Sequence, residues 1–143
     1  MAEATFFEDL EVGMDATYSR TVTMDDIEAF AEVSGDSNPL HLDETYAKGT
    51  FFKGRIAHGM LSAAYISKVL GTQLPGTGAI YLSQLLKFKA PVRPGDTVDT
   101  RVEITALDER RKRVTFACQC KVGDQVVVDG EAQLMVPSRE SNG

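Results

Sequence analysis

The sequence predicts an α+β domain in which an antiparallel β-sheet is wrapped around one central buried α-helix. The segment 57–70 is apolar on nearly all sides, and a helix of that kind must be enclosed by other elements. From residue 80 onward apolar and polar residues alternate, which is the period of strands with one buried face. The first half reads as helical and the second as stranded, an order typical of α+β layering.

The first half is expected to contain a strand near residues 16–22 and then a helix. Thr23 is a suitable N-cap for that helix, and Gly35 a suitable stop. Apolar residues recur at every third position of the helix, at Met24, Ile27, Phe30 and Val33. The buried helix that follows is expected to stop at Gly71.

The second half is expected to form strands joined by turns at residues 93–96, 108–111 and 123–125. Alternate apolar positions are Ile80, Leu82, Leu86, Phe88, Val98, Val102, Ile104, Ala106, Val114, Phe116, Cys118, Cys120, Val122, Val126, Val128, Ala132, Leu134 and Val136. One such sheet around one helix is the hot-dog fold. A single copy leaves a strand edge and a helix flank exposed, so we expect a homodimer.

Composition and length indicate a single domain over residues 1–143, with residues 138–143 as a solvated, flexible tail. A net charge of -6, with scattered Lys and Arg, disfavours a nucleic-acid partner. No run approaches the ~20 apolar residues of a membrane span. The acidic N-terminus is unlike a signal peptide. We therefore expect a cytoplasmic protein.

Two cysteines, Cys118 and Cys120, are two residues apart in an expected strand and so face the same side. Side chains placed in this way are badly oriented for bonding each other. We interpret both as reduced core residues. No metal site is expected, because the two histidines form no recognisable ligand cluster with them.

The stretch from residue 34 to residue 43 contains the residues best suited to catalysis. Asp36 and His41 are five positions apart and can converge only if the backbone between them bends. Pro39 restricts Asn38, and Asn and Asp favour turns, so a bend is expected. A carboxylate and an imidazole sharing one water can move protons to and from a substrate. The alternative is that Asp36 caps a turn and His41 only packs.

A second motif enters the buried helix at Gly59. The N–H groups of a first helical turn lack intrahelical partners and, with the helix dipole, can stabilise a carbonyl oxygen that gains negative charge. His58 either lines the site or satisfies a helix end. Ser62, one turn later, either bonds the Asp36 carboxylate or bonds its own helix backbone. Gly59 itself could serve only close packing.

These two motifs resemble the MaoC-like (R)-specific enoyl-CoA hydratases, including those that feed polyhydroxyalkanoate synthesis. The similarity runs from about residue 7 to residue 137 and includes the segments 10–13, 36–43, 56–61, 88–92 and 95–96. It implies a homodimeric hot-dog protein that adds water in the syn sense to a trans-2-enoyl-CoA, giving a (3R)-hydroxyacyl-CoA. Asp36 would activate the water, His41 would handle the C2 proton, and the Gly59 amide would bind the thioester oxygen. No cofactor is implied, since coenzyme A is part of the substrate.

Acyl-chain length is expected to depend on Ala63, Ser67 and Leu70 on the helix face below Gly59 and on Leu134 of the last strand; the alternative is that these residues belong to the core. Cations that could meet the coenzyme A phosphates are Lys53, Arg55, Lys87, Lys89 and Arg93, although a solvated surface explains each of them equally well. A hot-dog thioesterase or acyl-carrier-protein dehydratase is less favoured, because their usual acid lies on the central helix and residues 57–70 contain none. A non-catalytic acyl-CoA-binding module remains the alternative of a different class.

Overall fold

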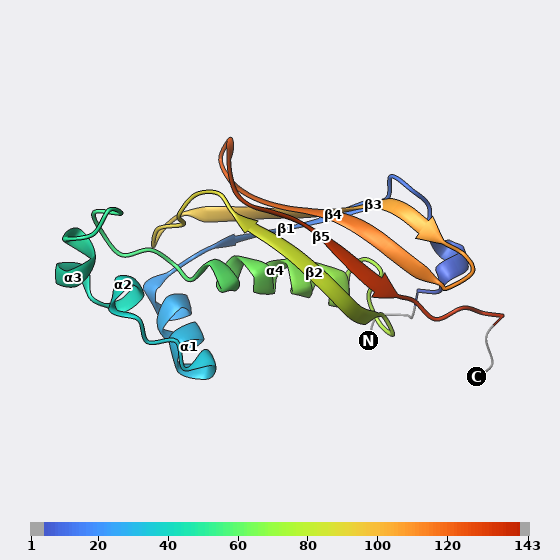
Figure 1. Cartoon of the computed structure of the whole chain (residues 1–143), viewed down its shortest axis with the longest axis horizontal. Helices are drawn as coiled ribbons and strands as arrows, with labels where there is room; N and C mark the ends of the chain where they lie inside the picture. Colours follow the sequence, from blue (N-terminus) through green and yellow to red (C-terminus); the bar gives the residue numbers. More distant parts are fainter. Residues whose placement is uncertain (1–4, 141–143) are drawn as a thin grey trace.

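The computed structural model describes residues 5–140 and has a single sheet laid over one long helix (Figure 1). The strands are antiparallel and lie in the order β1-β3-β4-β5-β2, so β1 and β2 are the edges. The elements in chain order are η1 (Phe7–Asp9), β1 (Asp15–Thr21), α1 (Met24–Ser34), α2 (Pro39–Leu42), α3 (Glu44–Lys48), α4 (Gly59–Thr72), β2 (Ile80–Phe88), β3 (Thr97–Asp108), β4 (Arg113–Val122) and β5 (Gln125–Met135). This arrangement confirms the hot-dog fold and the α+β class.

The core lies between α4 and the concave side of the sheet. Ile66, Val69 and Leu70 are fully buried on the helix, opposite Phe116 and Ile104 of the sheet. The helix does not stop at Gly71, as the sequence suggested, but continues to Thr72. Gly71 keeps an ordinary helical backbone and has open space beside it, so nothing there forces the chain to turn.

Helix α1 begins and ends where the sequence predicts. The Thr23 side chain accepts a hydrogen bond from the Asp26 amide, and Gly35 closes the helix at φ 80°. The expected apolar face is only partly right, because Val33 is 83% exposed whereas Ile27 is fully buried. A helix advances about 100° per residue, so a residue nine positions after Met24 lies on the opposite side.

Strand β5 contains an extra residue that the alternating pattern did not reveal. Cys120 pairs with Val128 and Lys121 pairs with Val126, so Val127 has no partner on β4 and forms a bulge. Val127 and Val128 are consequently both buried. The Val127 carbonyl instead accepts the amides of residues 89 and 90, just after β2.

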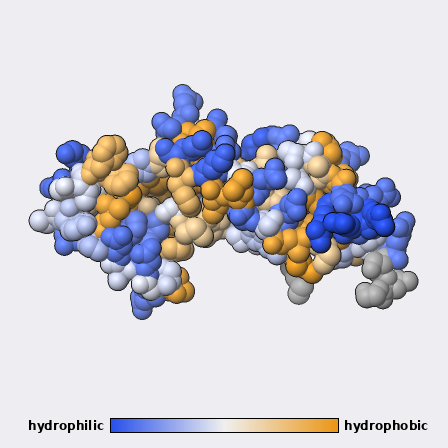
Figure 2. Space-filling model, viewed as in Figure 1, coloured by the Kyte–Doolittle hydropathy of each residue, from blue (hydrophilic) through white to orange (hydrophobic). Residues whose placement is uncertain are grey.

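One flank of the molecule is apolar and uncovered. On α4, Met60, Ala64 and Ser67 form an exposed stripe because they are spaced at three and four residues. On the edge strand β2, the exposed large apolar residues are Ile80, Tyr81, Leu82, Leu85 and Phe88. Figure 2 shows separate hydrophobic areas along the course of β2 on this face. We call the stripe and these β2 residues the apolar flank.

Cys118 and Cys120 are 1% and 0% exposed and are not bonded to each other. Burial raises the pKa of each thiol to about 11 from an ordinary 9.0. We therefore expect neither thiol to react with a thiol reagent in the native protein at pH 8, whereas both react in denaturant. The unfolded chain loses these protons first as pH rises, so stability should fall between about pH 9 and pH 11. Thiol titration and unfolding midpoints across that range check both expectations.

The C-terminal segment is held more firmly than the expected tail. Ser138 is 4% exposed, and its hydroxyl donates to Glu8 at 2.6 Å. Arg139 pairs with Asp9 at 2.7 Å. The solvated tail therefore does not begin at residue 138, and residues 141–143 of that prediction lie outside the described chain. Within residues 5–140, no helix is both long and apolar enough to cross a bilayer.

Candidate active site

The chain bends between Asp36 and His41 through a series of local hydrogen bonds. After the left-handed Gly35, the Asp36 carboxylate accepts the Asn38 amide at 3.3 Å. Asn38 has φ -54° and ψ 127°, outside the helical region as expected before Pro39, and its side chain caps α2 through the Leu40 amide. Asn38 thus supports the bend. The exposed carboxylate of Asp36 and the buried ring of His41 are brought to one place.

His41 is held in one orientation and one tautomer. Its ring Nδ1 lies 2.8 Å from the backbone carbonyl of Ile56. A carbonyl oxygen can only accept, so Nδ1 carries the proton and donates it. The other nitrogen, Nε2, is left free to exchange a proton with a bound molecule.

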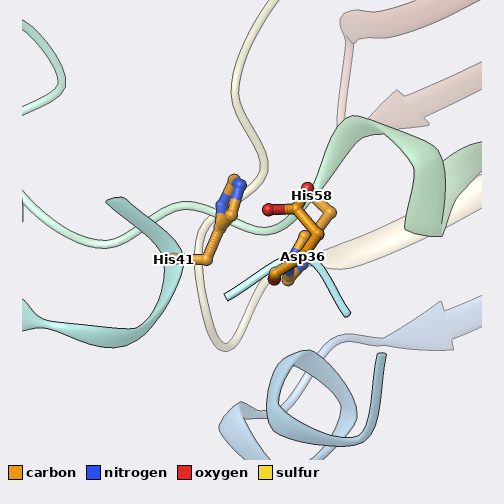
Figure 3. Close-up of side chains that lie close together, drawn as sticks. All are labelled: Asp36, His41 and His58. Atoms are coloured by element: carbon orange, nitrogen blue, oxygen red, sulfur yellow. The ribbon is translucent and has the colours of Figure 1, made fainter. Parts of the chain in front are cut away.

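His58 lies against both dyad residues, immediately before α4 (Figure 3). Its Nε2 is 2.9 Å from the backbone carbonyl of Asp36 and therefore donates to it. Its ring stacks on the His41 ring with centroids 3.8 Å apart and planes 28° apart. Phe30 of α1 packs against the His58 ring, with the two ring centroids 4.9 Å apart. His58 is 3% exposed, and its Nδ1 has no hydrogen-bond partner among the described residues.

The spacing of these groups brings a carboxylate and an imidazole within reach of one water molecule. A ligand atom from each of Asp36, His41 and His58 lies within 4.8 Å of the other two. Three atoms at that separation can all lie about 2.8 Å from one point, an ordinary hydrogen-bond length.

A cavity of about 260 Å³ opens beside this cluster at the start of α4. Its lining includes His58, Gly59 and Ser62 from the helix end and the segment from Phe88 to Val92 opposite. Gly59 is the first residue of α4 and is exposed, so its N–H lacks an intrahelical partner. A Cβ on Gly59 would lie 2.6 Å from the Phe88 ring. Any other residue here would require the Phe88 ring to move.

A second hollow, a groove of about 540 Å³, runs along α4 beneath β2. Ala63 and Ser67 line it, with Phe30 and Leu86 among the other walls. The structure thus places two of the four expected acyl-pocket residues on an open surface. Leu70 and Leu134 are 0% and 2% exposed, and they belong to the core rather than to the lining of either hollow.

Ser62 lines the cavity but makes neither of the side-chain bonds considered from the sequence. Among the described residues, its hydroxyl bonds neither the Asp36 carboxylate nor the backbone one turn earlier, although its carbonyl accepts a weak bond from Cys120. Sequence reasoning missed the cavity-lining roles of Phe51, Phe52, Val127 and Phe88. The segment 88–92, which the family resemblance includes, was a usable signal for Phe88, whereas the alternating pattern gave no sign of the bulge at Val127.

Of the five cations considered for phosphate binding, two are already engaged. Arg55 pairs with Glu44 at 2.9 Å, and Arg93 donates to the Phe52 carbonyl, which ties down the loop at residues 50–54. Lys89 is exposed and lines the cavity. It is the cation of this set that the structure places at the cavity.

A sheet wrapped around one helix, with a carboxylate and two imidazoles gathered at the start of that helix, defines a hot-dog protein with an acid/base site. Residues 7–126 match the model of the MaoC like domain, and the chain belongs to that family. It is 55% identical over 134 residues to an (R)-specific enoyl-CoA hydratase of Rhodospirillum rubrum, covering 94% of this chain and 93% of that protein.

Two further relatives agree with this assignment. A 3-hydroxybutyryl-CoA dehydratase of Methylorubrum extorquens is 52% identical, with 94% of this chain and 86% of that protein covered. The solved structure described as the (R)-hydratase from A. caviae involved in PHA biosynthesis superposes with a TM-score of 0.88 at 45% identity. That match covers 91% of this chain and 99% of the other.

Proposed function

We propose that this protein is an (R)-specific enoyl-CoA hydratase that converts trans-2-enoyl-CoA to (3R)-hydroxyacyl-CoA. The observation that carries the proposal is the convergence of Asp36 and His41 within reach of one water, beside the exposed N–H of Gly59. The similarity to a hydratase over nearly the whole chain supports the same reaction. The dehydratase relative is named for the reverse direction of this chemistry.

The reaction follows from the chemistry of these groups. Asp36 takes a proton from the water while the oxygen of that water bonds to C3 of the enoyl thioester. The electron pair of the C2–C3 double bond moves toward the thioester oxygen, which the Gly59 amide and the dipole of α4 stabilise. The proton held by Asp36 passes to the free Nε2 of His41, and Nε2 delivers it to C2, which leaves Asp36 ionised and His41 neutral as at the start. All atoms of the water end in the product.

Two other activities of hot-dog proteins fit less well. α4 contains no acidic residue between Gly59 and Thr72, so an acid placed on the central helix, as many thioesterases and acyl-carrier-protein dehydratases have, is absent from this helix. A non-catalytic acyl-CoA-binding module would have no need for a single defined His41 tautomer beside a carboxylate. Both features favour hydration.

The test is an assay with crotonyl-CoA that separates these activities. Hydration predicts loss of the enoyl thioester absorbance with no release of free thiol, and a 3-hydroxybutyryl-CoA product of R configuration by chiral analysis. Release of free coenzyme A would indicate a thioesterase and overturn the proposal. Binding without turnover would indicate an acyl-CoA-binding module and overturn it equally.

We also propose that the protein is a homodimer that pairs through the apolar flank. An uncovered edge strand with a row of exposed apolar residues commonly pairs with a strand of another chain. Leu85→Lys places a charge at the centre of β2, where Leu85 is 57% exposed. We expect this variant to be monomeric by sedimentation, whereas Thr17→Lys on the opposite edge β1 remains dimeric. A dimeric Leu85→Lys variant would count against this interface.

The groove along α4 lies within the apolar flank, and we propose that it holds the acyl chain at the interface of the dimer. Ser67 is exposed and small where it lines the groove, so Ser67→Leu should fill it. We expect turnover of a C8 enoyl-CoA to fall about tenfold or more relative to a C4 substrate, because overfilled apolar sites reject added methylenes. Rates on C4, C6 and C8 substrates measure this, and an unchanged preference contradicts the assignment.

We further propose a cytoplasmic role in fatty-acid or polyhydroxyalkanoate metabolism. The A. caviae structure is described as an enzyme of PHA biosynthesis, and (3R)-hydroxyacyl-CoA is the type of monomer such a polymer needs. Polymer accumulation in cells that contain a polymer synthase, with and without this protein, tests that role.

A further inference from the structure

The buried residue His58 contacts both members of the dyad yet has no place in the proton transfers above. Its ring is 3% exposed, stacks on the His41 ring and donates through Nε2 to the Asp36 carbonyl, so protein contacts already hold it in place. We propose that His58 is a positioning residue that fixes Asp36, His41 and the Gly59 amide relative to one another. This inference rests on the proposed hydratase activity.

The first contact fixes the loop that carries Asp36. The Asp36 side chain is exposed, and the other hydrogen bonds of this loop are local: the Asp36 amide donates to Ser34 Oγ, and the Asp36 carboxylate accepts the Asn38 amide. The hydrogen bond from His58 Nε2 to the Asp36 carbonyl is the long-range bond that joins this loop to the start of α4. A hydrogen bond in a buried setting is stronger than in water, so it limits how far the carboxylate can drift.

The second contact fixes the plane of the His41 ring. The bond from Nδ1 to the Ile56 carbonyl sets one point of that ring, but the ring can still tilt about the bond. Stacking on His58 at 3.8 Å restricts the tilt. Nε2 of His41 is therefore aimed by two independent contacts.

The third link is covalent, since His58 precedes Gly59 in the chain. The amide proposed to bind the thioester oxygen belongs to the peptide bond between His58 and Gly59. A shift of His58 would move that amide and both dyad residues together. Catalysis is sensitive to such shifts, and a misplacement of about 1 Å can lower a rate about a hundredfold.

Two variants separate the contacts of His58. His58→Gln retains an N–H that can reach the Asp36 carbonyl but removes the stacked ring, whereas His58→Phe retains a ring face but removes the donor. We expect each to lower kcat about tenfold to a hundredfold with KM changed less than about threefold, and His58→Ala to lower kcat further. Ile66→Val is the matched control for core destabilisation, and it should leave kcat unchanged.

The outcomes distinguish this inference from the proposed function. If the wild-type protein hydrates crotonyl-CoA and both variants keep kcat within about twofold while only their melting temperatures fall, His58 is merely structural and the inference is overturned. If the wild-type protein does not hydrate, the proposed function itself fails.

A measurement on the wild-type protein covers the case in which the variants do not fold. Imidazole ¹⁵N NMR at neutral pH should show a proton on Nε2 and a bare Nδ1 for His58, and the opposite tautomer for His41. The reverse tautomer at His58 would exclude the bond to Asp36 and overturn the inference.

Discussion

Replacing Asp36 by Asn, or His41 by Gln, is expected to lower kcat for crotonyl-CoA hydration at least about a hundredfold in each case. Asn cannot take a proton from water, and Gln cannot exchange a proton through a ring nitrogen. Asp36→Asn keeps the size of the side chain, and folding should be little affected because Asp36 is exposed. His41→Gln keeps a polar side chain but gives up the hydrogen bond from Nδ1 to the Ile56 carbonyl, because the Gln amide nitrogen takes the place of Nε2. Steady-state rates with circular dichroism of each variant measure both effects.

The matched control is Asp43→Asn. Asp43 lies two residues after His41 and caps α3 by accepting the Tyr46 amide at 3.1 Å, a role that Asn fills equally well. Its kcat should equal that of the wild type. If the Asp36 and His41 variants also remained near wild type, the dyad mechanism would be wrong.

The second large effect is expected at Gly59. In Gly59→Ala the added methyl group would lie 2.6 Å from the Phe88 ring, so the ring must move. The ring can do so because Phe88 is 55% exposed, and the fold should survive. The methyl group and the displaced ring nevertheless crowd the amide that is proposed to stabilise the thioester oxygen. Loss of such a donor costs about 10²–10³ in rate, and we expect kcat/KM to fall by that order.

Two further variants identify the cause of that loss. Gly71→Ala adds a methyl group to the same helix where nothing lies within 4 Å, and it should leave activity unchanged while raising stability by about 0.5–1 kcal/mol. Gly59→Ala combined with Phe88→Ala removes the clash. If the double variant recovered full activity, crowding by Phe88 would explain the loss and access to the amide would not.

Much of the fold could be predicted because its signals are local. Thr23 and Gly35 bound α1 through caps that involve only neighbouring residues, and the alternation in the second half follows from one buried face. The failures have non-local causes. Val127 is an extra residue whose place is set by pairing with β4 and by the segment after β2. Gly71 remains helical because tertiary packing of α4 overrides its weak helix propensity.

For the active site too, the features that could be predicted are local and those that could not are non-local. The bend from Asp36 to His41 could be predicted, since Asn38 and Pro39 act on the adjacent backbone. The stacking of His58 on His41 could not, because it depends on where α4 begins relative to α2 in space. Placing Leu70 and Leu134 in the pocket failed for a related reason. Helical spacing gives the direction of a side chain but not whether the space beside it is filled by the sheet.

The bulge at Val127 links the sheet to the active site by a route that avoids the catalytic residues. Its carbonyl accepts hydrogen bonds from the amides of Lys89 and Ala90. These are the two residues after Phe88, whose ring lies against Gly59. The segment that covers the active-site cavity is thus held in place by β5, the strand next to β2 in the sheet. Deletion of Val127 would leave every hydrogen-bonded pair between β4 and β5 available, but it would remove the carbonyl that holds residues 89 and 90. A variant of this kind should remain folded and bind its substrate more weakly.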